Sequence, residues 1–306
     1  MTKHKYLVSV VGPTAAGKTQ TAIYLAQTFN TVVVSFDSRQ FYKEMKIGTA
    51  VPSDEELKQV PHYFIQHLSI HDQYSVGAYE KAALSLLKDL FQKHDMIIFT
   101  GGSFLYQKAV LEGLDTFPEV APDIRNGLGK ELKEKGLSQL VEELRVVDYE
   151  SYNEIDIQNP RRVVRALEIY RASGKPYSSF KNQQPKHRFF NSIEIGLELP
   201  REILYEKINR RVDRMLEIGL IDEVISLKEF QDYNALKTVA YNEIFSYLNR
   251  EITLNQAIDL TKRNSRRYAK RQLTWLRKRN KIYWFQQDVH QKSVELIRKK
   301  VFNFPN

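Results

Sequence analysis

The sequence of 306 residues contains no cysteine. It therefore cannot form disulfides or bind a metal through thiolates, and we expect a protein of the reducing cytoplasm. Its seven histidines include no H-E-x-x-H pattern, which would indicate a metalloprotease zinc site. His67 and His71 are four residues apart but lack the glutamate of that pattern. We expect both to pack against other side chains or to face solvent.

Long hydrophobic runs are also missing. No apolar segment approaches the roughly 20 residues that span a bilayer. The sequence enters an apolar run almost at once, at Tyr6, so we expect no signal or transit peptide. Apolar residues make up 42% and charged residues 27% of the chain, as in ordinary soluble proteins. The composition predicts a globular cytoplasmic protein without a membrane segment.

Acidic residues are absent from the stretch 262–281, which holds ten lysines and arginines. Residues 1–200 hold 24 basic and 24 acidic side chains, whereas residues 201–306 hold 22 and 13, so the net charge of +9 arises entirely in the C-terminal third. A helix with charge of one sign repels itself unless an anion lies against it. The stretch is either a solvated helix face or a nucleic-acid surface, and a phosphate-binding motif in the same chain favours the second.

That motif lies near the N-terminus and matches the pattern G-x-x-x-x-G-K-[ST]: Gly12, Pro13, Thr14, Ala15, Ala16, Gly17, Lys18 and Thr19. A β-branched run (6–11) precedes it and a helical pattern (20–29) follows, as a phosphate-binding loop requires. The glycines let backbone N–H groups converge on an anion, and the helix N-terminus adds partial positive charge. Lys18 adds a full charge, and Thr19 can hold a Mg²⁺ that the phosphates share. The motif leaves the phosphate compound open.

A second β-branched run (31–36) ends at Asp37, Ser38, Arg39 and Gln40. In an open α/β sheet, residues just past the carboxyl ends of strands line the ligand crevice. Asp37 should therefore face the same cleft as the phosphate-binding loop. The alternatives are that Asp37 caps a helix and that Arg39 is an ordinary surface charge.

The third apolar run (96–99) lacks an acidic residue at its end and continues as Thr100-Gly101-Gly102-Ser103. Many ATP-hydrolysing P-loop proteins place an aspartate here to hold Mg²⁺. The two glycines either let a ligand approach the backbone closely or form a plain turn. The missing acid counts against nucleotide hydrolysis.

From about residue 114 to 184, helical patterns (120–135, 136–147 and 161–173) occur without a strand signal. We interpret this segment as a helical insert. Asn159, Pro160, Arg161 and Arg162 begin its last helix, where proline suits the first turn. These arginines and Arg165 favour a phosphate ligand, or they pair with the acidic residues nearby.

The remaining patterns complete an α/β core. Strands are expected at 193–197 and 282–285, helices at 76–94, 201–217, 220–230, 237–249 and 253–279, a loop with a short helix at 44–74, and a polar C-terminal tail. We predict a P-loop NTPase-like core with a parallel sheet flanked by helices, plus an all-helical insertion domain. The predicted boundaries are 1–113 for the first part of the core, 114–186 for the insert and 187–306 for the rest.

Several blocks together resemble one family, the bacterial tRNA dimethylallyltransferases (isopentenyltransferases). They occur in the family's order and span residues 12 to 275. Besides the phosphate-binding loop, the blocks are Asp37 to Gln40 with Tyr42, Ile47-Gly48-Thr49-Ala50, Gly101-Gly102, Gln158-Asn159-Pro160-Arg161-Arg162, Arg165-Ala166-Leu167-Glu168, Gly174-Lys175-Pro176 and Arg267-Tyr268-Ala269-Lys270-Arg271-Gln272-Leu273-Thr274-Trp275. The loop alone is unspecific, whereas the combination is highly specific.

The resemblance implies transfer of a dimethylallyl group from dimethylallyl diphosphate to N6 of adenosine 37, beside the anticodon, in tRNAs that read codons beginning with U. It implies that Gly12 to Thr19 bind the diphosphate, with Lys18 catalytic and Mg²⁺ at Thr19. Asp37 would be the general base, and Ser103 would lie beside the reacting base. The implied tRNA-binding residues are Asp37, Ser38, Arg39, Gln40, Ser103, Arg125, Gln158, Asn159, Pro160, Arg161 and Arg162. A monomer that binds the anticodon stem-loop is expected.

The chain departs from the family pattern at three places. Ser103-Phe104 stands for Thr-Gly, Phe36 for a small residue, and Ala240 for a glycine. We expect Phe104 to add bulk near the substrate channel. Tyr268, within the basic stretch, is expected to pack the helix.

Three rival functions share some of these features. An ATP-dependent small-molecule kinase also needs the phosphate-binding loop and an aspartate after the second strand. An adenine-nucleotide isopentenyltransferase uses the same donor with a free nucleotide, and an RNA-binding NTPase transfers no group. The basic stretch 262–281 argues against the first two, because a small acceptor has no need of it. The residue at the third strand's end, Thr100, argues against the third.

Overall fold

The computed structural model describes residues 4–181 and 184–301. The chain divides into two compact units. Met1–Glu112 together with His187–Asn306 form the core unit, and Gly113–Lys186 form the insert unit. Each has its own hydrophobic core. None of the described helices is long and apolar enough to cross a bilayer.

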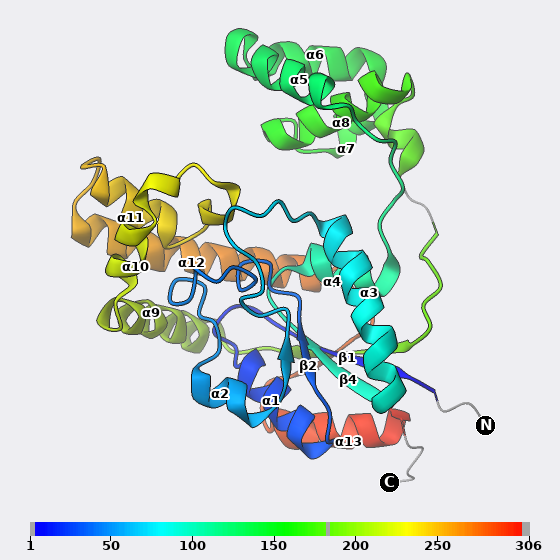
Figure 1. Cartoon of the computed structure of the whole chain (residues 1–306), viewed down its shortest axis with the longest axis vertical. Coiled ribbons are helices and arrows are strands. Elements are labelled where there is room, and N and C mark those ends of the chain that lie inside the picture. Colours follow the sequence, from blue (N-terminus) through cyan, green and yellow to red (C-terminus); the bar gives the residue numbers. More distant parts are fainter. Residues whose placement is uncertain (1–3, 182–183, 302–306) are drawn as a thin grey trace. The chain divides into compact units, whose positions relative to one another are not determined.

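The core unit is built on a six-stranded parallel sheet with the order β3-β2-β4-β1-β5-β6 (Figure 1). Its strands are β1 (Tyr6–Val11), β2 (Val33–Ser35), β3 (His62–Tyr63), β4 (Met96–Thr100), β5 (Asn191–Leu197) and β6 (Ile282–Phe285). Central β1 is apolar almost throughout because both faces of the sheet are covered. The predicted P-loop-like α/β class is confirmed. The two-residue strand β3 was missed, since it is too short to show a pattern.

Helices cover both faces of this sheet. On one face, α1 (Lys18–Thr28) and α13 (Val289–Val301) pack over Val8, Val10 and Ile98. On the other face, α3 (Val76–Lys93) and α4 (Phe104–Glu112) pack over Leu7 and Ile97. The alternation of side chains along β1 and β4 therefore divides the core into two layers.

A second group of helices adjoins the sheet's carboxyl edge: α9 (Arg201–Glu217), α10 (Leu220–Ser226), α11 (Tyr241–Leu248) and α12 (Leu254–Leu276); the short α2 (Asp54–Gln59) follows β2. The basic helix α12 begins at a capping box in which Thr253 and Gln256 satisfy each other's backbone N–H groups. It buries Ala257, Ala269 and Leu276. Sequence periodicity thus located α12 correctly, although it ends three residues before the predicted Arg279.

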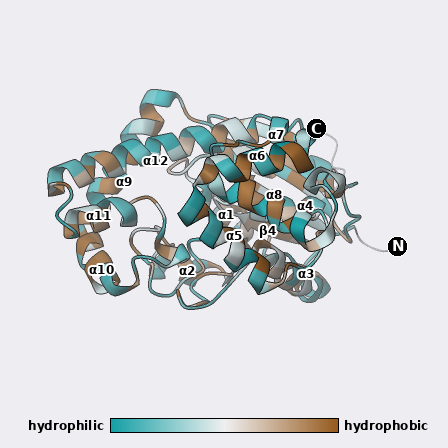
Figure 2. Cartoon of the chain, turned by 90° about the horizontal axis from the view of Figure 1, so that it is seen from above, coloured by the Kyte–Doolittle hydropathy of each residue, from teal (hydrophilic) through white to brown (hydrophobic). Residues whose placement is uncertain are grey.

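The insert unit consists of α5 (Pro122–Lys135), α6 (Leu137–Val147), α7 (Tyr149–Glu154) and α8 (Pro160–Ser173). These helices mix hydrophilic and hydrophobic residues (Figure 2), and their apolar faces meet around Leu128, Leu144 and Leu167. Arg171 of α8 pairs with Glu131 at 2.5 Å and with Glu143 at 2.6 Å, which ties three helices together. No strand occurs in the part of this unit that the structure describes.

Two predicted segments differ in the structure. The C-terminal tail was expected to be merely polar, but α13 folds there because Val294 and Ile297 bury an apolar stripe against the sheet. The predicted helix 237–249 begins only at Tyr241, because Ala240 has a positive φ of 76° that no helix accommodates.

A buried ion-pair network fixes the chain just beyond α12. Arg279 donates to Glu194 of β5 and to Glu112 of α4, both at 2.8 Å, and Gln107 donates to Glu194 at 3.0 Å. Glu194 is 6% exposed as a side chain and Arg279 is 15% exposed. Burial raises the pKa of Glu194, and Arg279 opposes that rise. The network therefore anchors the end of the basic helix to the sheet.

Replacing Arg279 by Met should destabilise the protein by about 3–5 kcal/mol near pH 7, because it leaves a buried carboxylate unpaired. This loss of unfolding free energy should be smaller at about pH 4.5, because the raised pKa lets Glu194 become neutral there. Urea unfolding at both pH values measures this. Arg277→Met is the control: its pair with Glu198 is exposed, so its cost should stay below about 1 kcal/mol. Equal costs for both variants would contradict the prediction.

Candidate functional site

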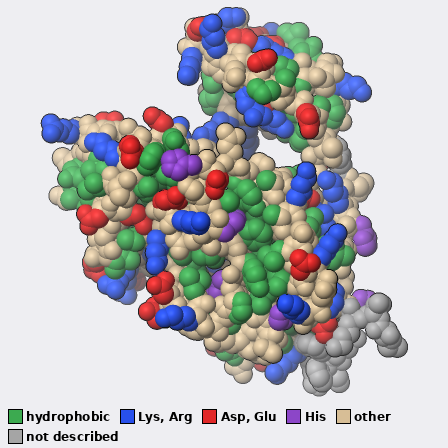
Figure 3. All heavy atoms as spheres, viewed as in Figure 1, with side chains coloured by type: hydrophobic (Ala, Val, Ile, Leu, Met, Phe, Trp, Pro, Cys, Tyr) green, Lys and Arg blue, Asp and Glu red, His purple; other side chains and the backbone are tan. Residues whose placement is uncertain are grey.

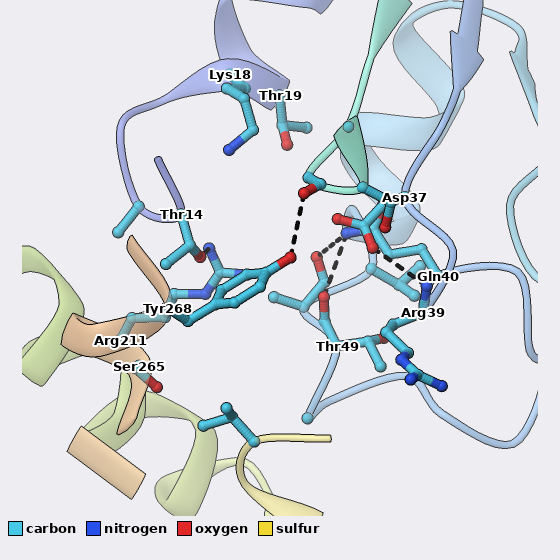
Figure 4. A pocket seen from close by; sticks show the side chains of 18 of the residues that line it. Thr14, Lys18, Thr19, Asp37, Arg39, Gln40, Thr49, Arg211, Ser265 and Tyr268 are labelled. Carbon is cyan, nitrogen blue, oxygen red and sulfur yellow. Dashed lines mark hydrogen bonds between the residues drawn. The ribbon is translucent and has the colours of Figure 1, made fainter. Parts of the chain in front are cut away.

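A cavity of about 850 Å³ opens at the carboxyl edge of the sheet. It is lined by the phosphate-binding loop after β1, the turn after β2 and the glycines after β4, together with parts of α9 and α12. Figure 4 shows Lys18, Asp37 and Tyr268 approaching it from three different elements. The shared cleft predicted for the loop and Asp37 therefore exists, because parallel strands end at one edge.

The phosphate-binding loop has the backbone that an anion site needs. Gly12 and Gly17 have positive φ values of 154° and 93°. A Cβ on Gly12 would lie 2.8 Å from the carbonyl oxygen of Leu197, so only glycine fits. Lys18 Nζ donates to the carbonyl of Pro13 at 2.8 Å. Burial lowers the pKa of Lys18 to about 8, with Asp37 opposing and Arg211 reinforcing the shift.

Asp37 lies in a turn and caps no helix. Its Oδ1 accepts the N–H of Arg39 at 3.2 Å, and the N–H of Gln40 bonds to the Asp37 carbonyl at 3.0 Å. The N–H of Ser38 donates to Ser103 Oγ at 3.0 Å, and the two serine hydroxyls are 2.8 Å apart. The turn after β2 is therefore joined to the turn after β4.

Gly101 and Gly102 explain how these turns come so close. A Cβ on Gly101 would lie 2.6 Å from the backbone nitrogen of Asp37, and one on Gly102 would lie 2.8 Å from Asp37 Oδ2. The glycines admit the neighbouring loop of the protein itself. Both interpretations weighed from the sequence, ligand approach and plain turn, missed this.

Arg39 and Gln40 make contacts inside the core unit. The guanidinium of Arg39 donates to the carbonyls of Asn234 and Ala235 at 2.9 and 2.8 Å, so it is no ordinary surface charge. Gln40 Nε2 donates to the carbonyls of Thr49 and Ala50 at 3.2 and 2.8 Å. Gln40 thus holds a segment of the cavity wall, and Arg39 holds the segment that precedes the lining residue Lys237. Their predicted contact with tRNA stays a prediction.

Three residues that the sequence did not indicate as functional line the same cavity. Arg211 of α9 donates to Thr14 Oγ1 at 3.4 Å, and burial lowers its pKa while Asp37 opposes. Gln272 bonds to the N–H of Thr14 at 2.8 Å. Tyr268, expected only to pack the helix, donates to the carbonyl of Gly102 at 3.1 Å. The four-residue spacing of 268 and 272 could have indicated a shared helix face.

The departures from the family pattern lie in different surroundings. Phe104 is 6% exposed, stacks on Trp275 with ring centroids 5.2 Å apart, and lies 6.4 Å from the ring of Phe36. It therefore fills the core at the start of α4 and does not line the cavity, unlike the bulk near the channel that the sequence led us to expect. Ala240 does line the cavity, and its φ of 76° is strained for a residue other than glycine. Its N–H bonds to Glu243 at 2.7 Å.

The predicted residues of the insert lie around α8. Asn159 caps this helix by accepting the N–H of Arg161 at 3.1 Å, and Pro160 occupies its first turn. Arg162 is exposed, and the N–H of Gln158 bonds to Asp156. Arg125 of α5 pairs with Glu168 at 3.2 Å, and Arg165 pairs with the same carboxylate at 2.9 Å. Arg165 therefore pairs with an acid, as the second alternative expected. Arg162 faces solvent, and its contact with a phosphate stays a prediction.

The cations of α12 likewise include some that form ion pairs and others that do not. Lys262 pairs with Asp213, and beyond the helix Arg277 pairs with Glu198. Within the described residues, five other cations on α12 have no ion-pair partner: Arg263, Arg266, Arg267, Lys270 and Arg271. Arg266 donates instead to the neutral side chain of Asn209 at 2.6 Å. Charges of both signs are intermingled on the face seen in Figure 3. The five cations without an ion-pair partner share one helix.

The cavity offers few metal ligands. Among described residues, no cluster of three His, Asp or Glu could hold a metal ion. The hydroxyl of Thr19 and the carboxylate of Asp37 do line the cavity. Mg²⁺ often takes one or two protein oxygens and completes its shell with substrate phosphates and water. These residues therefore fit a Mg²⁺ that is bound chiefly through a diphosphate.

The fold and the cavity define a P-loop protein with a carboxylate opposite its anion site and a helical insert. The family model for IPP transferase matches residues 40–279. A tRNA dimethylallyltransferase of Christiangramia forsetii is 50% identical over 97% of this chain and 98% of its own. The chain belongs to the IPP transferase family.

Solved structures agree with this assignment. The tRNA isopentenylpyrophosphate transferase of Bacillus halodurans matches with a TM-score of 0.72 and 36% identity, covering 98% of both chains. A eukaryotic dimethylallyltransferase acting on tRNA matches with a TM-score of 0.84 at 24% identity, covering 98% of this chain and 80% of that one. The second likeness shows a shared fold.

The lowered pKa of Lys18 predicts pH-dependent anion binding. Below about pH 8 the ammonium is charged and attracts inorganic pyrophosphate, whereas at higher pH it becomes neutral and the attraction is lost. The affinity advantage of wild type over Lys18→Met should therefore narrow between about pH 7 and about pH 9.5. Calorimetric titration of both proteins with pyrophosphate measures this advantage. The protonation of pyrophosphate affects both proteins equally, so it cancels in the ratio of their affinities. A constant advantage across this range would contradict the prediction.

Proposed function

We propose that this protein transfers the dimethylallyl group of dimethylallyl diphosphate to N6 of adenosine 37 in tRNAs that read codons beginning with U. The products are N6-dimethylallyladenosine and diphosphate. The observation that carries the proposal is one cavity that joins an anion-binding loop to a carboxylate, Asp37, in a chain of the IPP transferase family.

One half of the site would stabilise the leaving group. Within the loop Gly12 to Thr19, Ala15, Gly17 and Thr19 line the cavity and would present backbone N–H groups, and Lys18 and Arg211 add positive charge there. Such preorganised donors act where negative charge develops as the C1–O bond breaks. Mg²⁺ at Thr19 would supply further neutralisation of the diphosphate when bound.

The other half would activate the acceptor. The N6 amine is a weak nucleophile because its lone pair is delocalised into the ring. As N6 bonds to C1 of the allylic group, Asp37 accepts the proton that N6 loses, and diphosphate departs. Ser103, bonded to Ser38 at 2.8 Å, would lie beside the base. The adenine must leave its stack to reach this cavity.

The remaining predicted residues would bind the anticodon stem-loop. Arg125 and Gln158 to Arg162 belong to the insert unit, and Ser38, Arg39 and Gln40 to the core unit. The unpaired cations of α12 would contact RNA phosphates, which accounts for a basic stretch that a small acceptor does not need. We propose that the protein acts as a cytoplasmic monomer.

A single labelling experiment tests the proposal. Purified protein receives labelled dimethylallyl diphosphate, Mg²⁺, tRNA, AMP and ATP in one mixture. Label in tRNA supports the proposal, and label in AMP indicates an adenine-nucleotide isopentenyltransferase. Consumption of ATP without transfer of label indicates an NTPase or, with a phosphorylated metabolite, a kinase.

Asp37→Asn tests the proposed base while preserving the shape of the side chain. Asparagine can still accept the N–H of Arg39, but it cannot take a proton from N6. Turnover should fall about 10²- to 10⁴-fold, the usual contribution of proton transfer. Affinity for tRNA, measured by filter binding, should change little. Turnover within a few-fold of wild type would exclude Asp37 as the base.

Salt dependence tests the role of α12. Binding of tRNA should weaken steeply as salt rises, and Arg267→Ala should lower the slope of log affinity against log salt by about 1. Arg298→Ala is the matched control, because it removes the same charge from an equally exposed position on a different helix, α13. An unchanged slope in Arg267→Ala, or an equal change in the control, would remove the helix from the proposed surface.

A further inference from the structure

Gln272 connects two parts of the cavity that come from different strands. Its Oε1 accepts the N–H of Thr14, in the phosphate-binding loop after β1, at 2.8 Å. Its Nε2 donates to the carbonyl of Gly102, in the turn after β4, at 3.1 Å. The residue is 4% exposed. One buried amide therefore spans the two loops.

Both contacts lie next to reacting groups of the proposed function. Thr14 belongs to the loop that would hold the leaving diphosphate. Gly102 lies against Asp37, because a Cβ there would be 2.8 Å from Asp37 Oδ2 and 3.1 Å from Gln272 Nε2. The bridge thus runs from the leaving-group side of the cavity to the side of the base.

The helix that carries Gln272 is firmly held. Ala269 and Leu276, on either side of Gln272 in sequence, are completely buried. Just beyond the helix, Arg279 is anchored to Glu194. Tyr268 reinforces the bridge by donating to the same Gly102 carbonyl at 3.1 Å. A side chain fixed by packing and by hydrogen bonds at both polar atoms suits a positioning role.

We propose that Gln272 is a positioning residue that sets the spacing between the phosphate-binding loop and the turn after β4, against which Asp37 lies. This inference rests on the proposed function. Displacement requires N6, C1 and the leaving oxygen to lie in line, and a misplacement of about 1 Å can cost about 10²-fold in rate. The amide of Gln272 ties the loop after β1 to the turn after β4, and Ser103 joins the turn after β4 to that after β2.

Two substitutions separate positioning from direct binding. Gln272→Met keeps the length of the side chain but makes neither hydrogen bond. Gln272→Glu still accepts the N–H of Thr14, cannot donate to Gly102, and adds negative charge beside the diphosphate. Thr274→Val is the control on α12, because the Thr274 hydroxyl donates to the Lys270 carbonyl of its own helix and Thr274 does not line the cavity. For each protein we would measure kcat, KM for dimethylallyl diphosphate, Kd for inorganic pyrophosphate and for tRNA, and the melting temperature.

The Met variant should lose about 30- to 100-fold in kcat, with pyrophosphate and tRNA affinities within about 3-fold of wild type. The Glu variant should lose as much kcat and also bind pyrophosphate more weakly. The Thr274→Val control should match wild type.

Other outcomes overturn the inference. A kcat of Gln272→Met within about 3-fold of wild type excludes positioning. A loss that appears as weaker pyrophosphate binding in the Met variant makes Gln272 a diphosphate ligand instead. If the Met variant does not fold, an unchanged kcat in Gln272→Glu still refutes the proposal. Failure of the wild type to transfer label to tRNA would refute the proposed function, a separate result.

Discussion

A positive charge held in a partly enclosed cavity, opposite a carboxylate, is the constraint on which this structure depends. Lys18 lines this cavity and is partly buried, and the cost of its burial lowers its pKa to about 8. An anion in the cavity would remove that cost, because it would replace lost hydration with direct attraction. Parallel strands make the arrangement possible, since they bring the loop after β1 and the turn after β2 to one edge.

The basic helix α12 has one face toward the cavity and another toward solvent. Its inner face carries Tyr268 and Gln272, whose polar atoms bond to the loops of the cavity. Its outer face carries cations such as Arg267 that are exposed. Charge that is paired, as in Lys262 and Arg279, stabilises the fold, whereas the unpaired remainder is available to a polyanion. One element can therefore organise the chemistry and present a surface to RNA.

The departures from the family pattern show how packing decides the effect of a residue. Phe36 and Phe104 each replace a smaller residue, and their rings lie in one aromatic cluster with Phe99 and Trp275. Extra volume in the core is tolerated where neighbouring side chains fill it together. Ala240 is different, because its positive φ costs conformational energy whatever surrounds it. The hydrogen bonds of Glu243 to Ala240 and Asn264 hold that conformation.

Sequence alone determined the features that depend on local chemistry. The glycines and Lys18 of the phosphate-binding loop follow from a fixed spacing, and the strand and helix periods predicted the α/β core and the helical insert. Asp37 could be assigned to the cleft because strand ends in a parallel sheet share an edge.

Only the tertiary structure decided the contacts that join distant segments. Gln272 and Thr14 are 258 positions apart, and no local pattern specifies which neighbour a polar side chain meets across such a distance. The inward orientation of Tyr268 and the outward position of Phe104 relative to the cavity likewise depend on how whole helices rotate against the sheet. That rotation is set by the summed packing of many side chains, which a single stretch of sequence does not contain.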